Sequence, residues 1–319
     1  MSETAAETSP RNDFRKRRFR FDLFLVLTWV ASVATVVTLV WIVLSILQAA
    51  FPAMAATGLN FFVNAIWNPN RNVYGVFPFL NGTAGSSGFA LLLALPLGVA
   101  IAIFLSEDFL PTPVRQVIRF VVELLAAIPS VVYGLWGIAV VIPIVQSCGG
   151  FLAQYLGFLP FFKPPVTGNS MLTASVVLAL MVLPTITAIS RSALVAVPKT
   201  LREGSYAVGA TRWETIFKVL LPTAAPGIVA ATILAFGRAM GETMAVAMLI
   251  GNSPRLTWSL LSPAGTLAGL LANQFGEASG MQVSALMYAA LTLVVLTLFV
   301  NIAGELVLRH TQKTIAGIR

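Results

Sequence analysis

The chain has 319 residues, of which 57% are hydrophobic and 10% are charged, and its formal net charge is +8. A soluble domain carries about 25% charged residues, so this composition leaves too little polar surface for a water-soluble globule. Apolar blocks of roughly 20 residues match the hydrocarbon core of a bilayer, and helices satisfy their own backbone polar groups there. We therefore expect an all-α membrane protein whose basic residues orient helices in a lipid bilayer and bind no nucleic acid.

Cysteine and histidine are too scarce for several classes of site. The single Cys148 excludes an intrachain disulfide framework and a multi-cysteine metal site, and the single His310 argues against a histidine-based metal centre. No nucleophile–base set is recognisable, and the chain has no G-x-x-x-x-G-K-[ST] phosphate loop. We therefore expect no metal, no cofactor and no catalytic residue, which disfavours a membrane enzyme.

The N-terminal region divides into a tail and a first apolar block. Residues 1–20 are polar and then basic, and we interpret them as a disordered cytoplasmic tail that precedes a membrane domain over 21–319. The block Phe21–Leu47 is too long for a signal peptide and lacks a small-residue cleavage site, so we predict an uncleaved first span. Six transmembrane spans are predicted, over residues 22–48, 84–106, 117–146, 171–196, 221–250 and 282–308.

The distribution of lysine and arginine predicts the orientation of these spans. If the N-terminus is cytoplasmic, the outside segments hold Arg71, Lys163 and Arg255, and Arg238 lies within a span. The inside segments hold the other sixteen basic residues: Arg11, Arg15, Lys16, Arg17, Arg18, Arg20, Arg115, Arg119, Arg191, Lys199, Arg202, Arg212, Lys218, Arg309, Lys313 and Arg319. Because cytoplasmic loops carry an excess of basic residues, we expect both termini in the cytoplasm.

Between the fourth and fifth spans, residues 197–222 have the pattern of a helix, a turn and a second helix. Pro198 suits a helix start, and Gly209 suits the left-handed residue that ends a helix. Thr211 with Glu214 three residues later forms a capping box for the second helix, and Pro222 begins the fifth span. The charged residues expected to face the cytoplasm are Lys199, Arg202, Glu203 and Arg212.

The spacing in this loop resembles the EAA loop of ABC-importer permeases. Glu203 is followed six residues later by Gly209 and then by Leu221–Pro222, although Gly204 and Ser205 replace the family's two alanines. The resemblance implies that a coupling loop, residues 198–222, docks on a separate ATP-hydrolysing subunit. The residues implied in this coupling are Arg202, Glu203, Gly204, Ser205, Gly209 and Pro222. The alternative from physics alone is an inert interfacial helix.

The fifth predicted span contains two charges, Arg238 and Glu242, at i and i+4, which we expect on one helical face. Charges inside a span usually face a protein interior or a wet cavity. The planar fork of arginine matches an oxyanion, and Glu242 would compete for Arg238 so that an anion binds only transiently. The alternative is that the two charges neutralise each other and hold neighbouring helices. Hydroxyls are weaker candidates, since such groups more often bond their own helix: Thr243, Ser130, Thr185, Thr187 and Ser190.

Four blocks together resemble the PstC-type permease family of bacterial high-affinity phosphate ABC importers. They are ELLAAIPSVVYGLWG (123–137), GATRWETIFKVLLP (209–222), GRAMGETMAVAMLIGN (237–252) and NQFGEA (273–278). The resemblance implies a type I ABC importer permease fold in the bacterial inner membrane, with transport charges at Arg238 and Glu242. It also implies four partners: a second permease subunit (PstA-like), two ATP-binding subunits (PstB-like) and an external phosphate-binding protein (PstS-like).

Two other functions stay open from the residues alone. Arg238 fits any oxyanion, so a permease for molybdate or sulfate has the same sequence chemistry. A secondary transporter would need no ATPase and would often show an inverted internal repeat, and no convincing repeat is present. That class also leaves the EAA-like loop without a purpose.

Overall fold

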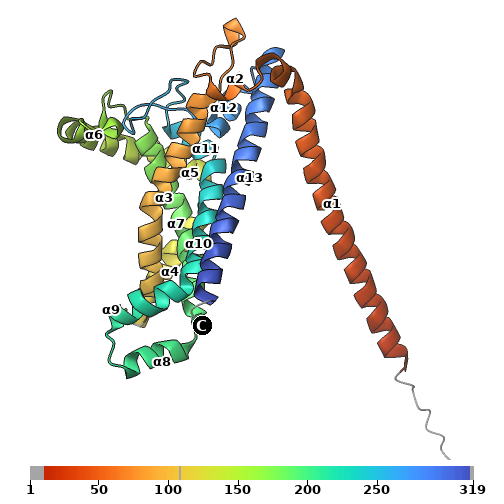
Figure 1. The fold of residues 1–319 in the computed structure, drawn as a ribbon, viewed down its shortest axis with the longest axis vertical. Coiled ribbons are helices and arrows are strands. Elements are labelled where there is room, and N and C mark those ends of the chain that lie inside the picture. Colours follow the sequence, from red (N-terminus) through yellow and green to blue (C-terminus); the bar gives the residue numbers. More distant parts are fainter. Residues whose placement is uncertain (1–10, 108, 317–319) are drawn as a thin grey trace, which may run out of the picture. The chain divides into compact units, whose positions relative to one another are not determined.

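The computed structural model describes residues 11–107 and 109–316. All the secondary-structure elements named in these residues are helical (Figure 1). A lone β-bridge joins Asn68 to Val73. The α-helices are α1 (Arg11–Thr57), α2 (Asn60–Val63), α3 (Phe77–Ser106), α4 (Thr112–Ala127), α5 (Ser130–Trp136), α6 (Ile142–Leu156), α7 (Met171–Val195), α8 (Lys199–Ala207), α9 (Arg212–Thr215), α10 (Leu221–Gly241), α11 (Met244–Leu249), α12 (Leu267–Gln274) and α13 (Met281–Ala316). Short 3-10 turns are η1 (Pro69–Arg71) and η3 (Pro160–Phe162), and π-helical turns are η2 (Gly137–Val141) and η4 (Ile216–Leu220).

The chain divides into two compact units, Met1–Ala49 and Ala50–Arg319. In the first unit α1 begins at Arg11, ten residues before the predicted start of the membrane domain. Residues 1–10 of the predicted tail lie outside the described residues, so its disorder stays a prediction. Every side chain from Leu23 to Ser45 is exposed, and hydroxyls such as Thr28 bond the carbonyl four residues earlier. An apolar helix that satisfies its own polar groups suits a lipid environment.

The prediction of six spans is confirmed in number, because six described helices are long and apolar enough to cross a membrane. Their ranges are Leu23–Thr57, Phe77–Ser106, Ser130–Leu156, Met171–Val195, Arg212–Gly241 and Met281–Arg309. The first range ends nine residues after its predicted end and the second begins seven residues before its predicted start, whereas the fourth and sixth agree with the prediction to within one residue. The third and fifth differ from the prediction in kind, since each is interrupted.

The third predicted span, 117–146, is wrong as a single helix. α4 ends at Ala127 and α5 begins at Ser130, with Ile128 and Pro129 extended between them. Proline pushes the residue before it out of the helical region, which explains the break. The continuous apolar helix of this region therefore runs over Ser130–Leu156, through α5, η2 and α6.

The fifth predicted span, 221–250, is displaced toward the N-terminus. α9, η4 and α10 form one continuous helix from Arg212 to Gly241, and the chain is then interrupted before α11 begins at Met244. The π-helical turn η4 ends two residues before Pro222. Proline lacks an N–H and clashes with the preceding turn, and a wider π turn accommodates it. The coupling loop therefore continues without a break into the helix that carries Arg238.

α3, α7 and α10 form the centre of the unit Ala50–Arg319. α3 packs along α7, and α10 contacts α3, α7 and α13. Glycines make these contacts close: a Cβ on Gly98 of α3 would lie 2.8 Å from Ile186 Cγ2, and one on Gly227 of α10 would lie 2.3 Å from the Ala193 Cβ. Small residues of this kind let membrane helices approach each other and gain van der Waals contact.

The two ends of this unit carry different elements (Figure 1). The α8–α9 end holds the coupling loop and the turn between α3 and α4, and the α12 end holds α2, α12 and the loops around them. At the α12 end, Phe61 stacks on Tyr288 with ring centroids 4.1 Å apart. Trp67 Nε1 donates to Gln274 Oε1 over 2.9 Å. These contacts order the segment between α1 and α3.

Candidate functional site

Arg238 lies in the last turn of α10, directly before a break in the chain. α10 ends at Gly241, and Glu242 adopts an extended conformation with φ −68° and ψ 122°. The prediction that Arg238 and Glu242 share one helical face is therefore wrong, because the helix does not continue through Glu242. Among the ion pairs formed by the described residues, none joins Arg238 to Glu242. The two charged groups thus lie on either side of a helix end.

The exposed side chain of Arg238 reaches across to α7. Its Nη1 donates to Thr185 Oγ1 over 3.2 Å, and this bond fixes the orientation of the guanidinium. An arginine side chain has five N–H donors in a planar fork, so one bond to Thr185 leaves donors for an anion. A planar fork of fixed orientation is the arrangement that recognises two oxygens of one oxyanion.

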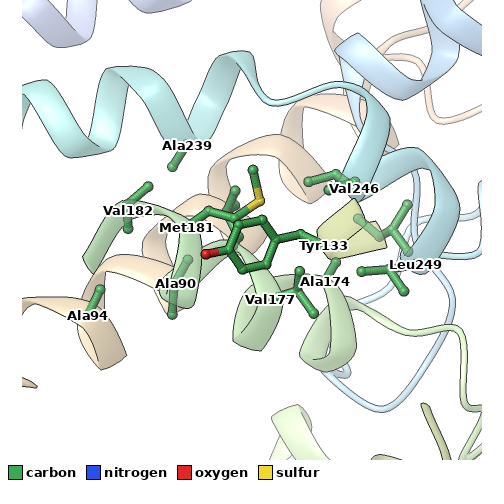
Figure 2. Close-up of a cluster of buried hydrophobic side chains, with 14 of the residues drawn as sticks. Ala90, Ala94, Tyr133, Ala174, Val177, Met181, Val182, Ala239, Val246 and Leu249 are labelled. Carbon is green, nitrogen blue, oxygen red and sulfur yellow. The ribbon is translucent and has the colours of Figure 1, made fainter. Parts of the chain in front are cut away.

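The break between α4 and α5 is followed by Tyr133, which belongs to the same buried cluster as Ala239, the residue after Arg238. Tyr133 of α5 is buried among side chains from α7, α10 and α11 (Figure 2). Its hydroxyl donates to the Leu125 carbonyl near the end of α4 over 2.8 Å, which satisfies one carbonyl that a helix end leaves open. Sequence reasoning does not single out Tyr133, although Pro129 four residues earlier is the signal that marks the break.

The short helices that follow the two breaks pack on each other. A Cβ on Gly134 of α5 would lie 2.7 Å from Met248 Sδ and 3.3 Å from Ala245 Cα, both on α11. Without a side chain at Gly134 the two helices approach closely. The segments that follow the breaks in the third and fifth spans are therefore packed against each other.

The remaining hydroxyl candidates occupy different environments. Thr243 Oγ1 donates to the Gly241 carbonyl over 3.2 Å, so it bonds its own backbone at the break. Ser130 is the first residue of α5. The hydroxyls of Thr187 and Ser190 are buried on α7 and have no hydrogen-bond partner within the described part of the chain. The structure therefore brings Thr185, and none of these four, into hydrogen-bond contact with Arg238.

In the coupling loop, the predicted helix–turn–helix is confirmed. Gly209 has a left-handed φ of 85° after α8, as its place in the turn predicts. Thr211 and Glu214 form a complete capping box at the start of α9. The Ser205 and Thr215 hydroxyls lie 2.9 Å apart and join α8 to α9. The loop is therefore a defined small unit whose two helices are held together.

The orientation of Arg202 differs from the prediction. Three of the four charged residues expected to be accessible are exposed: Lys199, Glu203 and Arg212. Arg202 instead turns inward, where its Nη2 lies 3.1 Å from Glu107 Oε1. Glu203 and Gly204 lie on the exposed part of α8, where a Cβ on Gly204 would meet no atom within 4 Å. The open face of α8 is thus carried by Glu203 and Gly204 rather than Arg202.

Comparison with known proteins places the chain in a family of membrane subunits. Residues 94–315 match the family described as binding-protein-dependent transport system inner membrane component. A phosphate transport system permease protein PstC of Xylella fastidiosa (strain Temecula1) is 40% identical over 96% of each chain. The PstC protein of Haemophilus influenzae is 38% identical over 92% of this chain and 94% of its own. These relatives confirm the predicted resemblance to PstC-type permeases.

Solved structures support the fold. A bacterial alginate ABC transporter chain, in complex with an alginate-bound periplasmic protein, gives a TM-score of 0.60 at 15% identity, over 90% of this chain and 94% of that one. An inward-facing chain of the MetNI methionine ABC transporter gives a TM-score of 0.53 at 25% identity, over 74% and 94%. The chain therefore belongs to the binding-protein-dependent transport system inner membrane component family and is a multi-pass permease subunit of an ABC transporter.

Proposed function

We propose that this subunit forms one half of a pathway for inorganic phosphate in an importer driven by ATP hydrolysis in partner subunits. The observation that carries the proposal is the guanidinium of Arg238, which lies at the interrupted end of a membrane-spanning helix and is oriented by Thr185. Relatives named as phosphate transport permeases match nearly the whole chain and support phosphate as the anion.

The exposure of Arg238 supports a partner on that side of the subunit. A charge within a membrane-spanning segment is costly in lipid and is normally covered by protein or a wet cavity. A second permease subunit (PstA-like) supplies this cover in our proposal, with the pathway between the two subunits. Two ATP-binding subunits (PstB-like) and an external phosphate-binding protein (PstS-like) complete the proposed importer.

The proposed orientation puts the α8–α9 end in the cytoplasm. The coupling loop carries Lys199, Arg202, Arg212 and Lys218, and basic loops stay on the cytoplasmic side. Both termini are then cytoplasmic. The exposed faces of Glu203 and Gly204 on α8 meet the ATP-binding subunit, and the loops of the α12 end receive phosphate from the binding protein.

Transient binding requires a means of release. A guanidinium holds two oxygens of phosphate well, and an anion bound permanently would block transport. Glu242 lies just beyond the helix end that carries Arg238, so a rearrangement of this break brings its carboxylate to Arg238 and displaces the anion. Movement of α9 reaches the break through the continuous helix Arg212–Gly241.

Thr185→Val is expected to lower phosphate uptake about two- to tenfold, because a hydrogen bond contributes about 0.5–1.5 kcal/mol and each 1.4 kcal/mol is about tenfold. Valine keeps the shape of threonine but leaves Arg238 without its orienting acceptor. The matched control is Thr232→Val on α10, whose hydroxyl bonds its own helix at Ile228. Initial uptake rates in proteoliposomes measure both variants. If the Thr185→Val importer took up phosphate at the parent rate, Thr185 would not be part of the functional site.

Phosphate uptake by proteoliposomes tests the proposed function directly. Vesicles contain the complete importer with ATP inside and the binding protein with labelled phosphate outside. We expect uptake that requires ATP and that unlabelled phosphate inhibits, whereas sulfate and molybdate do not. Stronger competition by sulfate or molybdate would identify a permease for that oxyanion. Uptake by this chain without ATP-binding subunits would identify a secondary transporter.

A further inference from the structure

An inward-facing ion pair holds the turn between α3 and α4 against the coupling loop. Arg202 Nη2, on α8, lies 3.1 Å from Oε1 of Glu107, the residue that caps the end of α3. The same Nη2 donates to the Leu194 carbonyl in the last turn of α7 over 2.9 Å. One guanidinium therefore connects α8 to the ends of two central helices.

The burial of this pair distinguishes it from the other ion pairs of the described residues. The Arg202 and Glu107 side chains are 19% and 14% exposed, whereas those of Arg119 and Glu123 on α4 are 59% and 61% exposed. Exposed pairs are screened by water and contribute little. Removal of one partner from a buried pair leaves a charge without compensation. Removal of Arg202 or Glu107 is therefore expected to cost more than removal of a partner from the exposed pairs.

Aromatic contacts join the same turn to the other helix of the loop. Phe109 stacks on Trp213 of α9 with centroids 5.1 Å apart and planes inclined by 27°. The Arg212 guanidinium carbon lies 5.9 Å from the centre of the Phe109 ring. Aromatic pairs and cation–π contacts both add to the energy of area burial. We call Glu107, Phe109, Arg202 and Trp213 together the α3–α4 clamp.

The clamp contacts the ends of α3 and α7, and α7 carries Thr185, the hydrogen-bond partner of Arg238. α3 packs along α7. Arg115 at the start of α4 donates to the Glu107 carbonyl over 3.4 Å, and the far end of α4 is bonded by Tyr133. A displacement of α8 therefore has a route through Arg202 and Glu107 that does not pass along the continuous helix Arg212–Gly241.

We propose that Arg202 and Glu107 are positioning residues for transport, which transmit movement of the coupling loop to α3, α4 and α7. Arg202 then acts inside this chain and not as a contact on the ATP-binding subunit. The inference rests on the proposed function as an importer permease. It predicts that a loosened clamp lets ATP hydrolysis proceed with less phosphate moved.

The test measures phosphate transported per ATP hydrolysed in proteoliposomes that hold the complete importer. Glu107→Gln removes the charge of the pair at nearly constant volume, and we expect the ratio to fall about tenfold, within the 5- to 150-fold range of typical coupling between sites. Arg202→Met should give a similar fall, and the double variant should be no worse than either single variant, as expected for residues that act through each other. The matched control, Glu123→Gln in the exposed pair, should keep the parent ratio.

The outcomes separate this inference from the proposed function. If the parent complex takes up no phosphate, the proposed function fails, whatever the variants do. If the parent transports and an assembled Glu107→Gln complex keeps the parent ratio, the clamp is overturned. The clamp would also be overturned if the effects of Glu107→Gln and Arg202→Met were additive and only Arg202→Met lost the ATP-binding subunit on purification. That result would indicate a direct contact between Arg202 and the ATP-binding subunit. Should Glu107→Gln fail to assemble, Phe109→Leu tests the same clamp without a buried charge, and its ratio should fall about threefold; an unchanged ratio would overturn the clamp.

Discussion

Phosphate uptake by an importer that carries Arg238→Gln is expected to fall about 10- to 100-fold. Hydrogen bonds to charged groups contribute about 1.5–3 kcal/mol, and each 1.4 kcal/mol is about tenfold. Glutamine retains a polar side chain but lacks the charge and the planar fork of donors, of which one bonds Thr185. The measurement is the initial uptake rate of proteoliposomes, normalised to the amount of complex that purifies with all subunits.

Two further substitutions make this result specific to the site. Arg309→Gln removes an exposed arginine near the end of α13, where it pairs with Glu305 of the same helix, and should keep the parent rate. Arg238→Lys keeps the charge without the fork and should fall between the parent and Arg238→Gln, because lysine is a point charge. An assembled Arg238→Gln importer that moves phosphate at the parent rate would remove Arg238 from the pathway.

Gly82→Ala is expected to destabilise the complex by about 1–3 kcal/mol, the usual cost of overpacking. A Cβ at this position of α3 would lie 2.0 Å from the Gly265 carbonyl oxygen, which is backbone and cannot rotate away. The next residue, Thr83, accepts a hydrogen bond from the Leu267 N–H over 3.0 Å. A shift of α3 that relieves the clash therefore also strains the start of α12. The melting temperature of the detergent-purified complex measures the effect.

Gly88→Ala on the same helix is the control for this prediction. A Cβ there meets no atom within 4 Å, and alanine is favoured over glycine in a helix by about 1 kcal/mol. Gly88→Ala should therefore melt at or slightly above the parent temperature. Equal melting temperatures for Gly82→Ala and Gly88→Ala would show that the purified complex has room for a methyl group between Gly82 and Gly265.

The features that the sequence predicts correctly depend on local chemistry. Apolar blocks long enough for a bilayer predict the six spans. The positive φ of Gly209 and the capping box of Thr211 with Glu214 depend on residues within one turn of each other. Both features can therefore be predicted from the local sequence. The family resemblance follows from blocks of the same kind and is confirmed by the relatives.

The breaks in the third and fifth spans are not visible in the same way. Apolar residues flank Pro129 and Glu242 on both sides, so hydropathy continues across each break as if one helix were present. Arg238 and Glu242 have helical spacing, yet α10 ends between them. The packing of α5 on α11 is a contact between segments far apart in the chain. It cannot be inferred from the residues that flank either break.

The sequence by itself determined the membrane location, the number of spans, the helix–turn–helix of residues 198–222 and the family of this protein, because length, polarity and short motifs are local properties. The tertiary structure alone decided that Thr185 bonds Arg238 and that Arg202 turns inward to Glu107. The two partners are 53 residues apart in the first contact, and in the second they belong to separate helices, α8 and the end of α3. Such pairs form only when helices pack, so their partners cannot be chosen from sequence spacing.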